Sequence, residues 1–413
     1  MPAFNPPRVA YFPDSFHEVN GVAHTSRHFQ AFARNHNLPF LCVRAGDRSP
    51  AFQKDGNLWT LELPRGMLAF ALEKDLSFDP AFPRHIPVIG DVLEEFQPTL
   101  IHITGPSELG LLGAALASEL ELPLAASWHT NVHEYLARRS HWLLRLLPDH
   151  HGLAAEKSLE DLTMAAAARF YSVAQLLFAP NPELCNQLRS LTGRPCSLMP
   201  RGVDTHLFHP RKRDRPTNQP FTLGFVGRLS VEKNVTLLAD IHDQILTLGV
   251  SSFRFLIVGH GAEEPTLRQR MPNADFTGVL HGEALARAYA NMDLFVFPSH
   301  TDTFGNVVLE ALASGVPALV TPHGGPRHIV RDAAASSPAR ATGRVLEDHE
   351  FAPAIANLIA QPALLATLRE NARAYALGNT WDAVFEGIYR AYAAILPHPS
   401  PPGCGYEMSE MRA

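Results

Sequence analysis

The segment TDTFGNVVLEALASGVPALV, residues 301–320, carries two carboxylates in places where they could act on a ligand. Asp302 opens the segment in a loop-like stretch, and Glu310 stands among apolar residues on a helix that is expected to be buried. A buried carboxylate without a partner is unfavourable by several kcal/mol, so Glu310 should have one. A simpler interpretation keeps Glu310 partly exposed and makes Asp302 a helix cap, and this segment alone does not separate the two.

The spacing of the two acids argues against a pair of hydrolytic carboxylates. Eight helical positions separate them by about 12 Å, whereas the carboxyl pairs of glycosidases stand about 5–9.5 Å apart. The acids are better placed to hold two parts of one ligand. Between them, the helix N-terminus offers free N–H groups and the positive end of a dipole, and both suit a phosphate.

The helix that carries Glu310 has recognisable ends. Thr303 or Asn306 is expected to cap its N-terminus, and Gly315 is expected to end it. Residues 318–320 then fit a short buried strand.

Two cations follow a predicted strand in FVGRLSVEKN, residues 225–234. Arg228 comes directly after the strand and Lys233 in the next turn, where a guanidinium and an ammonium could neutralise a diphosphate. A solvated loop is the alternative interpretation. The nearby stretch GHGAEE, residues 259–264, is only superficially like a dinucleotide-binding fingerprint, because it lacks the third glycine.

The composition is that of a soluble globular protein with room for two domains: 413 residues, of which 46% are hydrophobic and 18% charged. The net charge of −6 argues against general nucleic-acid binding. The cysteines lack a C-x-x-C spacing, so we expect neither a disulfide framework nor a zinc ribbon, and a reducing cytosol is favoured. We expect no signal peptide and no membrane span, because no apolar run is long enough.

Apolar strand-like segments alternate with helical ones along the whole chain. In the first half the strands are expected at 8–12, 40–46, 100–105, 123–129, 177–180 and 196–200, with helices around 21–36 and 109–120. A second series of strands is expected at 222–227, 253–259, 275–278, 293–299 and 317–320. This alternation predicts parallel sheets that are covered on both faces.

We therefore expect an α/β protein with two doubly wound, Rossmann-like domains facing across a cleft, where such folds bind ligands. The first domain is expected to span 1–198 and the second 220–380, joined by a linker at 199–219. Residues 381–396 are expected to form a helix that returns to the first domain. The Pro- and Gly-rich end, 397–413, is expected to be a disordered tail.

Taken together, these segments resemble retaining glycosyltransferase family 4. FVGRLSVEKN, LIVGHGAEEPTLRQRMPNADFTG, DLFVFPSHTDTFGNVVLEALASGVPALV and GGPRHIV occur in the order and spacing of that family. In the first half, PDSFHEVNGVAHT, SWHTNVHEYL and MPRGVDTHLFHP agree with it. The resemblance covers residues 8–396 and implies the GT-B fold with a nucleotide-sugar donor. Within the family the chain looks nearest to bacterial α-mannosyltransferases that use GDP-mannose and to sulfoquinovosyl and other glycolipid glycosyltransferases.

The resemblance also implies a role for each of the two acids. They fall on the ends of the family's E-x7-E motif, so Glu310 would bind the ribose hydroxyls of the nucleotide and Asp302 a hydroxyl of the donor sugar. The other implied donor contacts are the side chains of His129, Arg228 and Lys233, the backbone of Gly21, and the backbone N–H groups of Phe304, Gly305, Asn306 and Val307. His129 would reach the sugar, and the two cations the diphosphate. Together with Asp302, these three side chains form the implied catalytic group.

Two positions depart from the family pattern. Asp302 replaces the usual Glu of the E-x7-E motif, and His328 replaces the Glu of a GG-x-x-E motif. Both departures bear on the donor sugar more than on the reaction type. The implied reaction is retaining, metal-independent transfer of a hexose from GDP-mannose or a UDP-hexose to a glycan, lipid or small-molecule acceptor, without a further cofactor. A zinc site at His129 and His133 is disfavoured, because the Glu of an H-E-x-x-H motif is missing.

Other functional classes stay open from the sequence: a GT-B sugar-nucleotide epimerase or hydrolase, a non-catalytic sugar-nucleotide-binding protein, and a Rossmann oxidoreductase, which the incomplete fingerprint disfavours. The segment YLARRSHWLLRLL, residues 135–147, combines arginines, a tryptophan and leucines. It fits an ordinary packed helix best. The alternative is a peripheral contact with the inner face of the membrane that would reach a lipid acceptor. A cytoplasmic location is expected in both cases.

Overall fold

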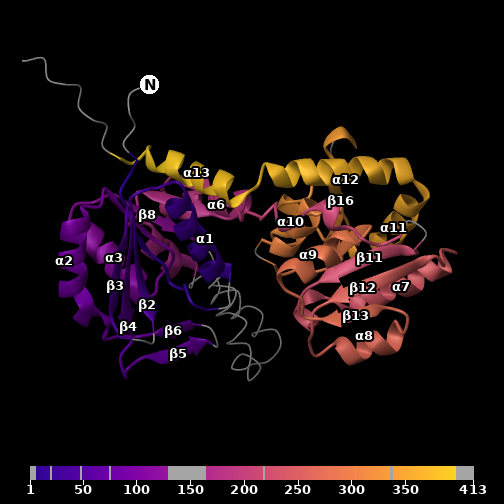
Figure 1. Ribbon diagram of the computed structural model, residues 1–413, viewed down its shortest axis with the longest axis horizontal. Coiled ribbons are helices and arrows are strands. Elements are labelled where there is room, and N and C mark those ends of the chain that lie inside the picture. Colours follow the sequence, from indigo (N-terminus) through magenta and orange to yellow (C-terminus); the bar gives the residue numbers. More distant parts are fainter. Residues whose placement is uncertain are drawn as a thin grey trace, which may run out of the picture.

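The computed structural model describes residues 6–18, 21–46, 49–73, 76–128, 164–216, 219–302, 304–334 and 338–396. These residues form two lobes, each built on a β-sheet, that lie side by side in Figure 1. His129 and the segment 135–147 lie outside the described residues.

The first lobe contains an eight-stranded sheet in the order β10-β9-β8-β7-β1-β2-β4-β3. Its strands are β1 (Val9–Phe12), β2 (Phe40–Gly46), β3 (Ala51–Asp55), β4 (Leu58–Pro64), β7 (Leu100–Ile103), β8 (Leu124–Ser127), β9 (Leu176–Ala179) and β10 (Cys196–Leu198). All neighbours are parallel except β3 and β4, which form an antiparallel hairpin. The six strands expected in this half are present. The hairpin was not anticipated, because β3 is exposed along its whole length and carries no apolar pattern.

Helices α1 (Gly21–Asn35), α2 (Ile86–Phe96), α3 (Glu108–Glu119) and α6 (Pro182–Thr192) connect these strands, with a short 3-10 turn η1 (Phe82–His85) before α2. A small separate hairpin consists of β5 (Phe70–Glu73) and β6 (Leu76–Phe78). The chain leaves β1 towards β2 on one side and later adds β7 on the other. This reversal beside β1 makes the sheet doubly wound, as predicted.

The second lobe contains a fully parallel sheet in the order β13-β12-β11-β14-β15-β16. Its strands are β11 (Phe221–Val226), β12 (Phe253–Val258), β13 (Asp275–Gly278), β14 (Leu294–Phe297), β15 (Ala318–Val320) and β16 (Gly343–Val345). The first five match the predicted series. The strand order reverses between β11 and β14, which places the switch point of this sheet beside the loops that follow those two strands.

The helices of the second lobe are α7 (Thr236–Thr247), α8 (Glu264–Arg270), α9 (Gly282–Ala290), α10 (Asn306–Ala313), α11 (Phe351–Ala360) and α12 (Pro362–Leu377). Short 3-10 turns are η2 (Pro210–Lys212), η3 (Val231–Lys233), η4 (Pro326–His328), η5 (Pro338–Arg340) and η6 (Asp348–Glu350). Within the described ranges no single helix is long and apolar enough to cross a membrane, and only the pair Asp348–Ala360 and Pro362–Leu377, bent by 104°, passes that test when joined.

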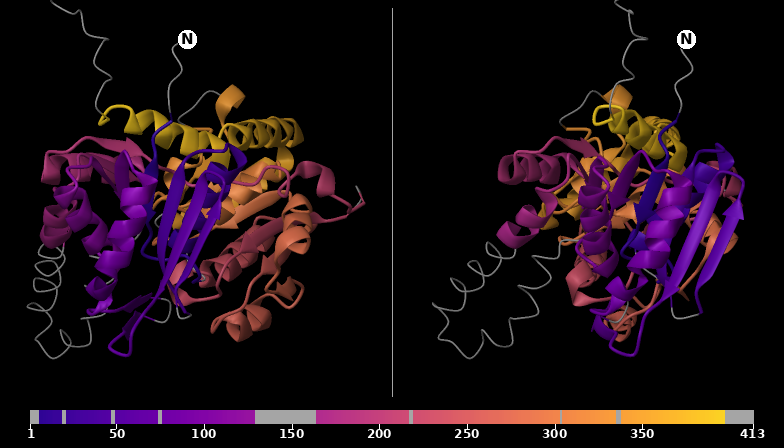
Figure 2. Two further views of the ribbon diagram at one scale, coloured as in Figure 1. Left: turned by 60° about the vertical axis from the view of Figure 1, so that its left-hand side comes forward. Right: turned by 90° about the vertical axis from the view of Figure 1, so that its left-hand side faces the viewer.

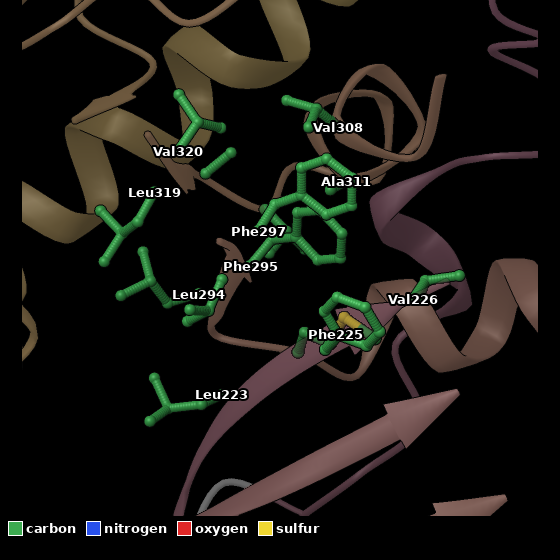
Figure 3. Close-up of a cluster of buried hydrophobic side chains, with 14 of the residues drawn as sticks. Leu223, Phe225, Val226, Leu294, Phe295, Phe297, Val308, Ala311, Leu319 and Val320 are labelled. Carbon is green, nitrogen blue, oxygen red and sulfur yellow. The ribbon is translucent and has the colours of Figure 1, made fainter. Parts of the chain in front are cut away.

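Helix α10 is fixed to the second sheet by apolar packing. Figure 3 shows Val308 and Ala311 of the helix directed towards Phe295 and Phe297 of β14. All four side chains are buried, and the ring of Phe297 stacks with that of Phe225. A helix anchored in this way holds its N-terminus in a defined place above the carboxyl ends of the strands.

The last helix, α13 (Trp381–Tyr392), belongs to the packing of the first lobe. Figures 1 and 2 show it continuing from α12 along the same side of the molecule. The Phe385 ring stacks on Phe29 of α1 with 4.5 Å between ring centroids. Thr380 caps the helix by accepting a hydrogen bond from the N–H of Ala383 at 3.2 Å. The chain therefore crosses between the lobes a second time just before α13.

The segment that joins β10 to β11 is held to the second lobe by ionic contacts. Asp293, directly before β14, accepts hydrogen bonds from Arg213 at 2.8 Å, from Arg369 at 3.1 Å and from Arg215. The backbone N–H of Thr222 donates to the same carboxylate at 2.9 Å. One buried carboxylate thus ties the connecting segment and α12 to the start of two neighbouring strands.

Candidate functional site

The N-terminus of α10 lacks the side-chain cap that the sequence suggested. Asn306 is the first helical residue rather than the cap, and Gly305 occupies the cap position with φ 92° and no side-chain hydrogen bond. A Cβ at residue 305 would also come within 2.9 Å of the Pro326 ring, so glycine is required there for space and for conformation. Thr303 lies outside the described residues. Gly315 follows the helix with φ 69°, as expected for a helix end.

Asp302 lies in the loop after β14 and pairs with Lys233. The Lys233 ammonium donates to Asp302 Oδ1 at 2.7 Å, and both side chains are about four-fifths buried. Within the described chain, the second carboxylate oxygen, Oδ2, is buried and has no hydrogen-bond partner. Buried acceptors are nearly always satisfied in folded proteins, so this oxygen is a candidate acceptor for a ligand hydroxyl.

The backbone of Asp302 is clamped by the loop after β15. The N–H of Gly325 donates to the Asp302 carbonyl oxygen at 2.6 Å. Gly324 has φ 69°, and a Cβ there would lie 2.6 Å from the same oxygen. The loops after β11, β14 and β15, which are adjacent in the sheet, therefore converge on the Lys233–Asp302 pair.

Glu310 is half-buried, and it has a hydrogen-bond partner. The Tyr289 hydroxyl of α9 donates to Glu310 Oε2 at 2.8 Å. Burial raises the pKa of Glu310 to about 7, although the hydrogen bond from Tyr289 acts in the opposite direction. The carboxyl group of Glu310 therefore has a pKa near neutral pH, and the hydrogen bond holds it in one defined orientation. Tyr289 was not identified from the sequence, because its only signal there is a tyrosine in a helical pattern 21 positions away.

Arg228 follows β11 as predicted, but its side chain does not join the Lys233–Asp302 pair. It is 74% exposed and stands 3.8 Å from Glu232, a weak surface contact. The glycines of the GHGAEE stretch have a packing role. A Cβ on Gly259 would lie 1.9 Å from the Gly227 carbonyl oxygen, and one on Gly261 would lie 2.2 Å from that of Leu229. These glycines allow the loop after β12 to support the loop that carries Arg228.

The remaining predicted residues are distributed between the lobes. Phe304 and Val307 flank the start of α10. Gly21 is the first residue of α1 in the first lobe. His328 lies 3.7 Å from Glu183 of α6, so this position contacts the first lobe.

The described ranges hold no group of three or more His, Cys, Asp or Glu side chains arranged to bind a metal ion.

Family models of known proteins match residues in both lobes. The family model for glycosyl transferases group 1 matches residues 220–361, and that for glycosyltransferase family 4 matches residues 19–207. The GDP-mannose-dependent alpha-mannosyltransferase of Corynebacterium glutamicum is 29% identical over 408 residues, covering 96% of this chain and 91% of its own. The enzyme of the same name from Mycobacterium tuberculosis is 32% identical over 318 residues, covering 73% of this chain and 75% of its own.

The fold agrees with these matches. The solved structure of sucrose-phosphate synthase from Thermosynechococcus elongatus is similar with a TM-score of 0.65 and 20% identity, covering 94% of this chain and 99% of that one. The two sheets, the first mostly and the second fully parallel, are those of the GT-B architecture. Since the family models cover both lobes and the similarity to mannosyltransferases runs through nearly the whole chain, the protein belongs to glycosyltransferase family 4.

Proposed function

We propose that this glycosyltransferase moves a hexose, with retention at the anomeric carbon, from GDP-mannose or a UDP-hexose to a glycan, lipid or small-molecule acceptor. The observation that carries the proposal is the unpartnered Asp302 Oδ2 beside Lys233, at an uncapped helix N-terminus. A sugar hydroxyl satisfies the free oxygen, and a diphosphate satisfies the ammonium and the helix end. Glu310, about one turn into α10, would receive the nucleotide ribose.

The chemistry asked of these groups is charge stabilisation. The bond between the anomeric carbon and the phosphate oxygen breaks, the acceptor oxygen forms the new glycosidic bond, and the acceptor proton is released. The nucleoside diphosphate leaves with additional negative charge. Lys233 and the positive end of α10 can stabilise that charge from defined positions, which is how preorganised groups lower such barriers, and the exposed Arg228 would have to turn towards them to contribute. Asp302 would hold the donor sugar in a fixed position by accepting a hydrogen bond from one of its hydroxyls.

A binding panel followed by turnover tests this function. Thermal shifts would be recorded with GDP, UDP, ADP and their sugars, because a ligand at 100 times its Kd adds about 2.7 kcal/mol of stability. We expect one base to be preferred, and we expect release of its nucleoside diphosphate to depend on an added acceptor. Product formation without acceptor would indicate an epimerase or hydrolase. Binding that never leads to turnover with any glycan or lipid acceptor would indicate a non-catalytic protein.

We predict that turnover does not require a metal ion. Lys233 and the α10 N-terminus already provide positive charge where the diphosphate would lie. Initial rates measured in excess EDTA should equal those in magnesium or manganese. Loss of activity on chelation, with recovery after either metal is added, would refute this prediction.

We predict that donor affinity rises with pH through about 7. Burial raises the pKa of Glu310 from 4.5 to about 7, and ribose hydroxyls donate best to the ionised carboxylate. The sign for stability is opposite: without ligand, this group's contribution is lost as pH rises from 4.5 to about 7, because only the folded state retains the proton. Calorimetry with an intact nucleotide sugar over this range would measure the effect. The Glu310→Gln variant should show a flat profile, and a flat wild-type profile would contradict the prediction.

A further inference from the structure

The loop after β15 and the short turn η4 lie against the segment that carries Asp302 into α10. The N–H of Gly325 donates to the Asp302 carbonyl oxygen at 2.6 Å. Pro326, the first residue of η4, is buried, and its ring would lie 2.9 Å from a Cβ at residue 305. A shift of η4 would therefore be passed to the backbone of Asp302 through a hydrogen bond.

The next two residues of η4 contact the first lobe. Arg327 Nη2 donates to Glu183 Oε2 of α6, and His328 Nε2 lies 3.7 Å from the same oxygen. The other amino group of Arg327, Nη1, donates to the Pro322 carbonyl oxygen at 2.8 Å within its own loop. Among the ion pairs of the described residues, those of Glu183 join the two lobes without involving the connecting segment or α13.

Glu183 is presented by a well-anchored helix. It lies in the first turn of α6, which Asn181 caps by accepting a hydrogen bond from the N–H of Leu184 at 2.8 Å. Leu184 is buried in the core of the first lobe. The Glu183 side chain is 64% exposed and that of Arg327 35%, and an ion pair so exposed contributes little to folding stability. An effect of this pair on activity can therefore be separated from an effect on stability.

We propose that Glu183 is a positioning residue for the transfer reaction. Its carboxylate holds Arg327, and with it η4, in one place. The loop that contains Arg327 then holds Asp302 where the donor sugar would meet it. This inference rests on the proposed function, because Glu183 would touch no substrate and would act only through Asp302. A residue of the first lobe would thus set the geometry of a site formed by the second lobe.

Charge reversal at both partners tests this role. In the wild type, Glu183→Lys replaces an attraction by a repulsion of similar size, so turnover at saturating donor should fall about tenfold. In an Arg327→Glu background, the same substitution restores an ion pair with reversed charges and should raise turnover. The bond from Arg327 to Pro322 is missing from both proteins of this second comparison, so its loss does not affect the result. A purely structural role of Glu183 predicts no such change of sign.

Glu283→Lys provides the matched control. Glu283 also lies in the first turn of a helix, is 70% exposed, and pairs with a cation, Lys212. Its reversal should leave turnover unchanged. Small-angle scattering of the ligand-free proteins would examine the contact between the lobes without any substrate. Glu183→Lys should increase the radius of gyration, and Glu283→Lys should not. Melting temperatures would identify any variant that fails to fold.

Two results would overturn the inference. One is equal turnover of folded Glu183→Lys and Glu283→Lys. The other is a double variant, Glu183→Lys with Arg327→Glu, that is no faster than Arg327→Glu alone. A wild-type protein that transfers no sugar from any nucleotide sugar would instead refute the proposed function. The scattering comparison would then still decide whether Glu183 holds the two lobes in contact.

Discussion

Replacing Lys233 by methionine is expected to lower turnover by about two to three orders of magnitude at saturating donor, the range seen when one preorganised charge-stabilising group is removed. Lys233 is the described cation that bonds directly to Asp302, at 2.7 Å, and it is largely shielded from solvent. Its charge would therefore act on the leaving diphosphate through little water. Steady-state rates with the preferred nucleotide sugar and acceptor would measure the loss.

Lys212 provides a matched control for this substitution. Its side chain is 21% exposed against 22% for Lys233, and it also pairs with a carboxylate, that of Glu283. Lys212→Met should therefore change stability to a similar extent without affecting turnover. Equal activities of Lys233→Met and Lys212→Met would show that Lys233 has no role in the reaction. Lys233→Arg, which keeps the charge but changes its shape, should have an intermediate rate.

The second large effect distinguishes the role of Glu310, on α10, from that of Asp302, in the loop before α10. Glu310→Ala should weaken nucleoside diphosphate and nucleotide sugar alike, since both carry the ribose. A lost hydrogen bond to a charged group is worth about 1.5–3 kcal/mol, or roughly 10- to 150-fold in affinity. Asp302→Asn should leave the affinity for free diphosphate nearly unchanged and lower turnover, because only the sugar would contact its free oxygen.

Calorimetry of both ligands, with rates and melting temperatures, would distinguish this division of roles from a structural one. A capping role for Asp302 predicts only a stability loss of about 0.5–2 kcal/mol on substitution by Ala. Equal effects of the two substitutions on free diphosphate binding would disprove the division. Normal turnover in both variants would disprove the site itself. Tyr289→Phe provides a further control, because it removes only the hydrogen bond that orients Glu310.

The second-lobe elements that form the site were largely predictable from local patterns. Gly315 after an apolar run, and a strand at 318–320, mark the limits of α10 because glycine and chain direction are local properties. Of the two caps predicted from the sequence, Asn306 was wrong and Thr303 lies outside the described residues. Asn306 has the right chemistry for a cap, but the left-handed Gly305 beside Pro326 occupies the cap position, so the helix begins one residue earlier. That close approach comes from a loop some 20 positions further along the chain.

The sequence by itself determined the alternation of strands and helices, the two acids and the loop cations, since these depend on periodicity and residue type. Only the tertiary structure decided which side chains meet. Lys233 and Asp302 are 69 positions apart, and Arg201 and Thr25 are 176 apart. Such pairs form because adjacent parallel strands bring their following loops to one edge, and because α13 returns to the first lobe and packs against Gly202. Strand order and close packing are properties of the whole chain, so no local pattern contains them.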